Sequence, residues 1–300
     1  MIATGRGSLL IAVLALLWGS NFLWIKIALD AFSPLQITAG RMVLGALVLL
    51  AVVLVTGQRL PSDWTTWGHL TVAALVANAV PYLLFAIGET RVDSGIAGAL
   101  NATTPLWTLV LADSFGQADR PRPRQVTGLV LGFAGSLLIF APWQNGYVDT
   151  WGALACLAAA FSYAVSYLYM ARYLTPRNLT PTVLSTGQLI AASIVTAAAL
   201  PFDGAGRAAA NVGTWAALCV LGVLGTGAAY VVNYTLLRME GPVAASVVIY
   251  LLPVVAITLG VLTLRETITV WLVLGVGLVL TAVNISRSGA SQKVGRGRGS

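Results

Sequence analysis

The sequence predicts an all-α membrane protein, with ten transmembrane helices arranged as an inverted 5+5 repeat around a central cavity. Three observations predict this fold. Of the 300 residues, 58% are hydrophobic and 9% are charged, whereas an average soluble domain is about 25% charged. Apolar runs recur that are long enough to cross a bilayer, for which a helix needs about 20 residues. The two halves of the chain also resemble each other.

The apolar runs follow one another with short loops between them, so neighbouring helices are expected to pack antiparallel. The first run follows Arg6 as a signal peptide would, but it is too long for one, and we expect a retained membrane helix. The expected spans are 9–29, 34–56, 69–88, 95–113 and 125–142 in the first half, and 151–173, 181–200, 213–237, 243–264 and 268–286 in the second.

The positions of Lys and Arg orient these spans, because cytoplasmic loops are rich in both. If the N-terminus is cytoplasmic, twelve basic residues fall in inner segments and three in outer loops. The inner ones are Arg6, Arg59, Arg120, Arg122, Arg124, Arg172, Arg177, Arg238, Arg287, Lys293, Arg296 and Arg298, and the outer ones are Arg91, Arg207 and Arg265. We therefore expect a multi-pass protein of the bacterial inner membrane with both termini in the cytoplasm. This distribution accounts for the net charge of +7 without a nucleic-acid partner.

An internal repeat is visible in the spacing of tyrosines and prolines. Tyr82 and Pro105 are 23 residues apart, as are Tyr230 and Pro253, and the two pairs share an offset of 148. Similarly, "PLQITAGRM" at the start of the second expected span resembles "PTVLSTGQL" at the start of the seventh, at an offset of 147. The chain thus divides into two units of similar sequence.

We place these units at residues 1–145, the first five-helix repeat, and residues 146–300, the second repeat with a flexible basic tail. Since five is odd, the second unit enters the membrane the other way up, as in an inverted repeat. Two oppositely oriented halves that exchange conformations open a carrier first to one side and then to the other. The repeat therefore predicts alternating access.

Three prolines lie near the middle of their expected spans: Pro81, Pro105 and Pro253. The last two match in the repeat, and Pro105 ends the polar stretch "ALNATTP" inside an apolar run. Proline has no N–H and leaves the carbonyl four residues earlier without its helical partner. In lipid such irregular backbone is tolerated where it faces protein or a wet cavity. We predict that the three prolines act as hinges or gates.

Polar and aromatic side chains gather at the same depth and are the candidate substrate-binding residues: Trp18, Asn21, Asn78, Tyr82, Asn101, Tyr163, Asn233 and Tyr250. Their amides would bind the polar part of a substrate, and their rings would stack on its apolar part. The alternative is structural, because polar side chains also join membrane helices, at about 0.6 kcal/mol per hydrogen bond. For each residue the choice between cavity and packing stays open.

Two basic residues, Lys26 and Arg41, lie within spans, one to two turns from the expected outer ends. One interpretation is that both extend to the membrane surface, with Lys26 also paired to Asp30 four residues later. The other is that they are gating cations at the outer side that meet a substrate carboxylate. The sequence leaves both open.

The motifs of other protein classes are missing from the sequence. There is no GxxxxGK[ST], so ATP is not the direct energy source. There is no HExxH, paired-cysteine motif or GxSxG, so we expect no enzyme, no catalytic residue, no metal and no cofactor. Every acidic residue lies in a loop or near a span end, whereas ion-coupled carriers usually hold an intramembrane carboxylate. This favours transport down a gradient.

Several stretches resemble the drug/metabolite transporter superfamily in its ten-helix EamA-type branch. They are "LLWGSNFLWIKIAL", "RMVLGAL", "AGALNATTPLWTLVLA" and "AASVVIYLLPVVAITLGVLTLRETITVWLVLGVGLVL", and together they cover nearly the whole chain. Within this branch the chain is most similar to the bacterial aromatic amino-acid exporters, the YddG group. One departure is "ADSFGQADRPRPRQ", which stands where the second half has Glu266 and Thr267. It puts the symmetry of an inner gate in question, but not the fold.

The resemblance implies a basket of ten helices with a central cavity, and export of Phe, Tyr and Trp. The partners would be amino acids and membrane lipid, and the oligomeric state is left open, with a monomer compatible. Because a fold does not fix a substrate, export of other metabolites or drugs remains an alternative. A membrane enzyme acting on lipid and a non-transporting scaffold are two further ones.

Overall fold

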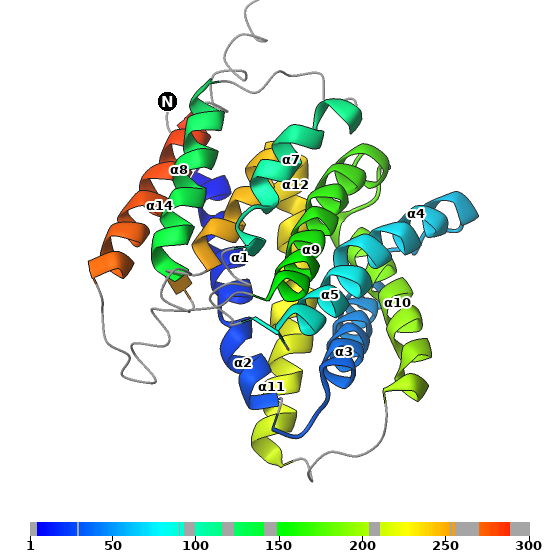
Figure 1. Ribbon diagram of the computed structural model, residues 1–300. Helices are drawn as coiled ribbons and strands as arrows, with labels where there is room; N and C mark the ends of the chain where they lie inside the picture. The colour runs from blue at the N-terminus through cyan, green and yellow to red at the C-terminus, as the bar shows by residue number, and fades with distance from the viewer. Residues whose placement is uncertain are drawn as a thin grey trace, which may run out of the picture.

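The computed structural model describes residues 5–28, 30–89, 91–92, 100–115, 123–140, 149–203, 211–252, 254–255 and 270–288. All regular secondary structure in these ranges is helical (Figure 1). The first half contains α1 (Gly5–Gly19), α2 (Asn21–Ala28), α3 (Pro34–Val55), α4 (Trp64–Ala74), α5 (Val80–Glu89), α7 (Thr104–Leu111) and α8 (Pro123–Phe140). The second half contains α9 (Thr150–Tyr169), α10 (Pro181–Ala199), α11 (Val212–Gly222), α12 (Ala229–Ser246) and α14 (Val270–Ser288).

Within the described ranges, five helical segments are long and apolar enough to cross a membrane. They are Pro34–Val55, Trp64–Phe85, Thr150–Leu174, Pro181–Phe202 and Val212–Val243, and shorter apolar helices include Gly7–Gly19 and Val273–Ala282. The prediction of an all-α membrane protein is confirmed. Several of these segments contain a short π-helical stretch, in which the helix is wider than an α-helix. Two of these stretches position the candidate site.

The helices α3 and α10 begin in the same way because the same local signals precede them. Ser33 and Thr180 are N-caps. The hydroxyl of each accepts a hydrogen bond from the backbone N–H three residues later, and a proline follows each cap. Each cap also reaches the end of the other helix. The Ser33 hydroxyl donates to the carboxylate of Asp203 after α10, and the Thr180 hydroxyl donates to Gln58 after α3.

These reciprocal contacts show that α3 and α10 lie side by side and antiparallel, as Figure 1 shows at the lower right. The two caps are 147 residues apart, which is the offset of the sequence repeat. The pair therefore has the geometry that a two-fold axis between inverted repeats requires.

Equivalent interruptions occur in the third helix of each half. A π-helical turn η1 (Leu75–Ala79) joins α4 to α5, and a second one, η6 (Val223–Ala228), joins α11 to α12. Their first residues are separated by 148 positions, the repeat offset. A π-turn widens the helix and is frequent at functional sites. Both turns face the neighbouring half, because η6 packs against α3 and η1 against α10.

The three predicted hinge prolines have different surroundings. Pro81 is the second residue of α5, just after η1, and the Ala77 carbonyl four residues earlier accepts a hydrogen bond from the Tyr230 hydroxyl at 3.2 Å. The helix is interrupted next to Pro105, as expected: a helical stretch at 100–101 is followed by a turn at 102–103, and Pro105 lies in the first turn of α7, where no N–H is needed. Its role as a hinge stays a prediction. Pro253 lies outside the described residues.

Close helix packing between the two halves also depends on glycines at two places away from the paired π-turns. The helices α8 and α14 lie side by side (Figure 1), and a Cβ on Gly135 would stand 2.8 Å from Val279 Cγ2. A Cβ on Gly132 would lie 2.5 Å from the ring of Tyr250. At the end of the eighth expected span, Gly241 takes a φ of 81° and bends the chain before Pro242.

Candidate functional site

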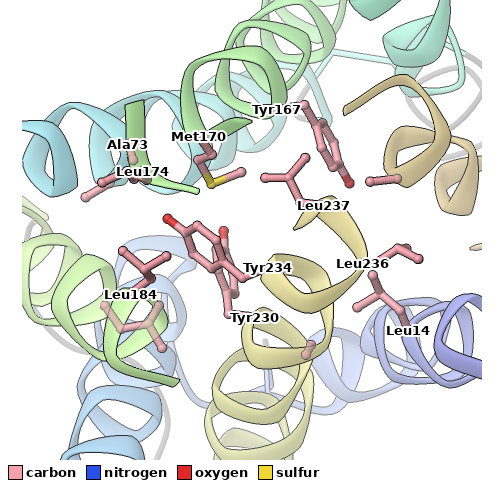
Figure 2. Packing of buried hydrophobic residues seen from close by; sticks show 14 of the residues in the cluster. Leu14, Ala73, Tyr167, Met170, Leu174, Leu184, Tyr230, Tyr234, Leu236 and Leu237 are labelled. Atoms are coloured by element: carbon pink, nitrogen blue, oxygen red, sulfur yellow. The ribbon is translucent and has the colours of Figure 1, made fainter. Parts of the chain in front are cut away.

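A chain of buried hydrogen bonds crosses from the first half to the second at η1. The Asn78 amide nitrogen donates to the Tyr230 hydroxyl at 2.6 Å, and its oxygen accepts from the Gln188 amide at 2.9 Å. The Tyr234 hydroxyl in turn donates to the Gln188 oxygen. Asn78, Gln188 and Tyr234 are fully buried. Figure 2 shows Tyr230 and Tyr234 extending from α12 toward Leu184 and Met170.

A second group of polar contacts lies at η6, one helical turn from the first. The Nε of Arg41 donates to the Thr226 hydroxyl at 2.8 Å, and its Nη2 donates to the Gly225 carbonyl at 3.4 Å. The Arg41 guanidinium lies over the ring of Tyr82, 5.1 Å from the centroid. Asn21 completes the group. With its oxygen toward Arg41 it accepts from Nη2 at 3.2 Å and donates to the Leu17 carbonyl.

We call these seven residues together the inter-repeat polar cluster: Asn21, Arg41, Asn78, Gln188, Thr226, Tyr230 and Tyr234. All of them are buried. Asn78 and Tyr82 are one turn apart on the third helix of the first half, as Thr226 and Tyr230 are on the equivalent helix of the second. The two groups of contacts are therefore neighbours along both helices.

Aromatic rings border the cluster. Trp18 packs edge-on against Tyr230, with ring centroids 6.3 Å apart. Tyr82 meets Tyr163 edge-on at 6.4 Å, and Tyr163 stacks on Phe85 at 6.0 Å. The combination of amides, hydroxyls, one guanidinium and several rings supplies the kinds of group that recognise a molecule with a polar head and an aromatic body.

The structure brings most of the predicted residues to this cluster or its border: Trp18, Asn21, Arg41, Asn78, Tyr82 and Tyr163. Their role toward a substrate stays a prediction. Asn233 is buried on α12, and its side-chain oxygen has no hydrogen-bond partner within the described ranges. Such a buried oxygen is costly unless water or a ligand bonds to it.

Two predicted residues lie elsewhere. Tyr250 is fully buried in a separate cluster with α8 and α14, where its hydroxyl donates to the Leu129 carbonyl at 2.9 Å. Asn101 is half-buried before α7, and its backbone carbonyl accepts from the Thr104 hydroxyl at 2.8 Å. The side chain of Lys26 is outside the described part of the chain.

Gln188, Thr226, Tyr230 and Tyr234 are cluster members that the predicted set does not contain. The repeat carries a signal that finds two of them. Gln188 is 147 positions after Arg41, and Thr226 is 148 positions after Asn78. The contacts Arg41–Thr226 and Gln188–Asn78 are therefore the same contact made once by each half.

Known proteins of similar sequence are transporters by name. The chain is 29% identical over 266 residues to the uncharacterized inner membrane transporter YedA of Escherichia coli K12, covering 88% of this chain and 85% of that one. It is 25% identical over 277 residues to an uncharacterized transporter of Archaeoglobus fulgidus, covering 92% and 97%. It is 28% identical over 284 residues to the uncharacterized transporter YvbV of Bacillus subtilis, covering 93% and 90%.

A solved crystal structure shares the fold, with a TM-score of 0.79 at 21% identity over 96% of this chain and 98% of that one. The model of the EamA-like transporter family matches twice, over residues 5–141 and 150–287. The two matches are consistent with the sequence repeat and take in both sides of the inter-repeat polar cluster. This chain belongs to the EamA-like transporter family.

Proposed function

We propose that this membrane transporter exports amino acids, chiefly the aromatic ones Phe, Tyr and Trp, from the cytoplasm by alternating access and without ATP. The observation that carries the proposal is the inter-repeat polar cluster. It joins the two halves at their paired π-turns and is bordered by aromatic rings. In carriers built from inverted repeats, the substrate site lies at the repeat interface near the membrane midplane, where helices are interrupted.

The chemistry of the cluster supports an amino acid as substrate. A zwitterion needs donors and acceptors in a small space, and Asn78 and Gln188 each offer both. The rings of Trp18, Tyr82 and Tyr163 supply an aromatic surface within reach of those polar groups. Edge-to-face pairs of aromatic rings are worth about 0.5–1.5 kcal/mol beyond the area that they bury.

Transport without ATP is supported by the absence of a nucleotide-binding motif from the sequence. Export is proposed from the resemblance of the sequence to the aromatic amino-acid exporters. The distribution of basic residues favours both termini in the cytoplasm, and we propose this orientation together with the function.

The test uses purified protein in liposomes loaded with radiolabelled phenylalanine. We expect efflux that requires the protein but not ATP, and competition by Trp and Tyr at lower concentration than by threonine, hypoxanthine or an amphipathic cation. The assay is run with the phenylalanine gradient alone, with an added pH gradient in each direction, and with an added membrane potential.

Asn78→Leu is the test variant, because it removes the centre of the cluster. Ser136→Ala is its control, because that buried hydroxyl bonds only within α8. We expect efflux to fall at least about tenfold in Asn78→Leu, the effect of roughly 1.4 kcal/mol, and to persist in Ser136→Ala. The proposal is refuted if phenylalanine moves under none of the gradients, or if a non-aromatic solute competes best.

A further inference from the structure

Arg41 carries a buried charge without a counter-ion among the described residues. Its side chain is 4% exposed, and all its protein partners are neutral. Within the same ranges the ion pair found, Arg177 with Asp63, lies at the surface. A buried charge costs several kcal/mol unless an opposite charge and hydrogen bonds compensate it. The position therefore retains a cation at a cost that packing does not explain.

The inverted repeat provides an internal comparison. At the equivalent position of the other half stands Gln188, which is neutral and makes the equivalent contact to Asn78 at 2.9 Å. An amide is thus enough to join the second helix of one half to the π-turn of the other. The positive charge of Arg41 is not needed for that contact, so it serves another purpose.

The surroundings of the two positions also differ. On the side of Gln188, Asn78 bonds directly to Tyr230 at 2.6 Å. The residues equivalent to that pair are Thr226 and Tyr82, by the offset of 148. Here the guanidinium is interposed, since it donates to Thr226 at 2.8 Å and lies over the Tyr82 ring.

The guanidinium also has donors left over. Its Nε bonds to Thr226, and its Nη2 bonds to Gly225 and Asn21. The Nη1 nitrogen, with two N–H groups, has no partner among the described residues. A free Nη1 can donate a charge-assisted hydrogen bond to a carboxylate oxygen. The guanidinium lies over the ring of Tyr82, and Tyr163 meets that ring edge-on, so aromatic surface adjoins the charge.

We propose that Arg41 binds the carboxylate of the transported molecule, which makes carboxylate-bearing aromatic compounds the substrate class. The inference rests on the proposed function. Arg41 contacts Asn21 and Tyr82 of its own half and Thr226 of the other. A movement of one half relative to the other would therefore change the contact between Arg41 and Thr226, and with it the access to the guanidinium, as alternating access requires.

The first experiment compares competitors of phenylalanine efflux: 3-phenylpropanoate, which keeps only the carboxylate, and phenylalaninamide, which lacks it. In the unchanged protein we expect 3-phenylpropanoate to compete and phenylalaninamide to be weaker by about tenfold to a hundredfold, the usual effect of one charge-assisted hydrogen-bonded pair.

Arg41→Gln is the test variant, because Gln is the residue that the fold already uses at the equivalent position. We expect its KM for phenylalanine to rise at least about tenfold and its preference for the carboxylate over the amide to disappear. Arg41→Lys keeps the charge and should retain the preference in part. Arg177→Gln is the control, since it removes a surface charge that pairs with Asp63, and it should keep the KM and the preference of the unchanged protein.

A second measurement separates this proposal from the proposed function. The melting temperature of the purified protein is recorded with 3-phenylpropanoate and with phenylalaninamide. If no amino acid is transported, the proposed function fails. Stabilisation by 3-phenylpropanoate that Arg41→Gln abolishes would still support a carboxylate site. The inference is overturned if Arg41→Gln keeps the preference for the carboxylate, or if the unchanged protein shows no such preference in either measurement.

Discussion

The contact between Asn78 and Gln188 allows a quantitative test of the inter-repeat polar cluster. Asn78→Leu leaves the Gln188 amide nitrogen without its acceptor, whereas the Tyr230 hydroxyl keeps the Ala77 carbonyl. A buried orphaned group costs about 1–3 kcal/mol, and a lost hydrogen bond between membrane helices costs about 0.6 kcal/mol. We therefore expect Asn78→Leu to lower the free energy of unfolding by about 2 kcal/mol.

Gln188→Leu should cost a similar amount, because it orphans the Asn78 oxygen and the Tyr234 hydroxyl. In the double variant Asn78→Leu/Gln188→Leu, only the Tyr234 hydroxyl loses its partner. The double variant should therefore be more stable than the sum of the single effects by about 1–2 kcal/mol.

The assay is reversible unfolding in mixed micelles, with the four proteins of the cycle compared in the same detergent. The control pairs Asn78→Leu with Thr196→Val, since the buried Thr196 hydroxyl on α10 bonds within its own helix. That pair should be additive. If the Asn78/Gln188 cycle is also additive within about 0.5 kcal/mol, the two amides do not interact, and the inter-repeat polar cluster does not join the halves.

Three further outcomes follow from packing and charge. Gly225→Ala should destabilise the protein by about 1–3 kcal/mol in the same assay, because the new Cβ would collide with Asn21. Gly68→Ala is the control and should leave the stability unchanged, because nothing lies within 4 Å of a Cβ at that position. Equal effects of the two substitutions would contradict the predicted collision. Tyr250→Phe should lower stability by about 1 kcal/mol yet leave the KM for phenylalanine unchanged, and a changed KM would return Tyr250 to the substrate site. The hydroxyl and the backbone N–H of Thr66 hold the pKa of the Asp63 carboxyl below its usual value. The stabilisation of the fold by the ionised carboxylate is therefore present at neutral pH and is lost as the pH falls through that lowered pKa. Acid titration of Asp63→Asn should therefore show a smaller loss of stability, and an unchanged loss would refute the assignment.

The sequence predicted the elements whose signals are local. The spans that correspond to α3 and α10 agree with the structure almost residue for residue, because an apolar run of membrane length is bounded by turn residues at both ends. Asn78 could be identified because it precedes Pro81 in an apolar run, and irregular backbone in lipid has to face a polar partner. The interruption at Pro105 was predicted, but not that Pro105 begins a new helix, since a proline inside an apolar run fits a kink and a first helical turn equally well.

Depth and residue type do not reveal which face of a helix a side chain occupies. Tyr250 was predicted to line the site from its depth and its place one turn after Ser246, beside Pro253, but its ring packs against α8 and α14. Gln188 was missed for the converse reason, since nothing near it in the sequence was taken to mark a polar contact, and Tyr234 was missed although it adjoins the predicted residue Asn233. The repeat offset identifies Gln188, because it is the position equivalent to Arg41 in the other half.

The difference between the two halves gives the inter-repeat polar cluster a direction. Two identical halves would make the same contact on both sides of the membrane midplane, and neither side would be distinguished. Here one side is closed by direct bonds among Asn78, Gln188 and Tyr230, and the other holds the guanidinium of Arg41. With the termini in the cytoplasm, as we propose, the directly bonded side lies toward the cytoplasm. A substrate leaving the cell would then have to separate Asn78 from Gln188 before it reached Arg41. Entry would break neutral hydrogen bonds of modest strength, whereas the charge that compensates the substrate lies on the side from which it is released.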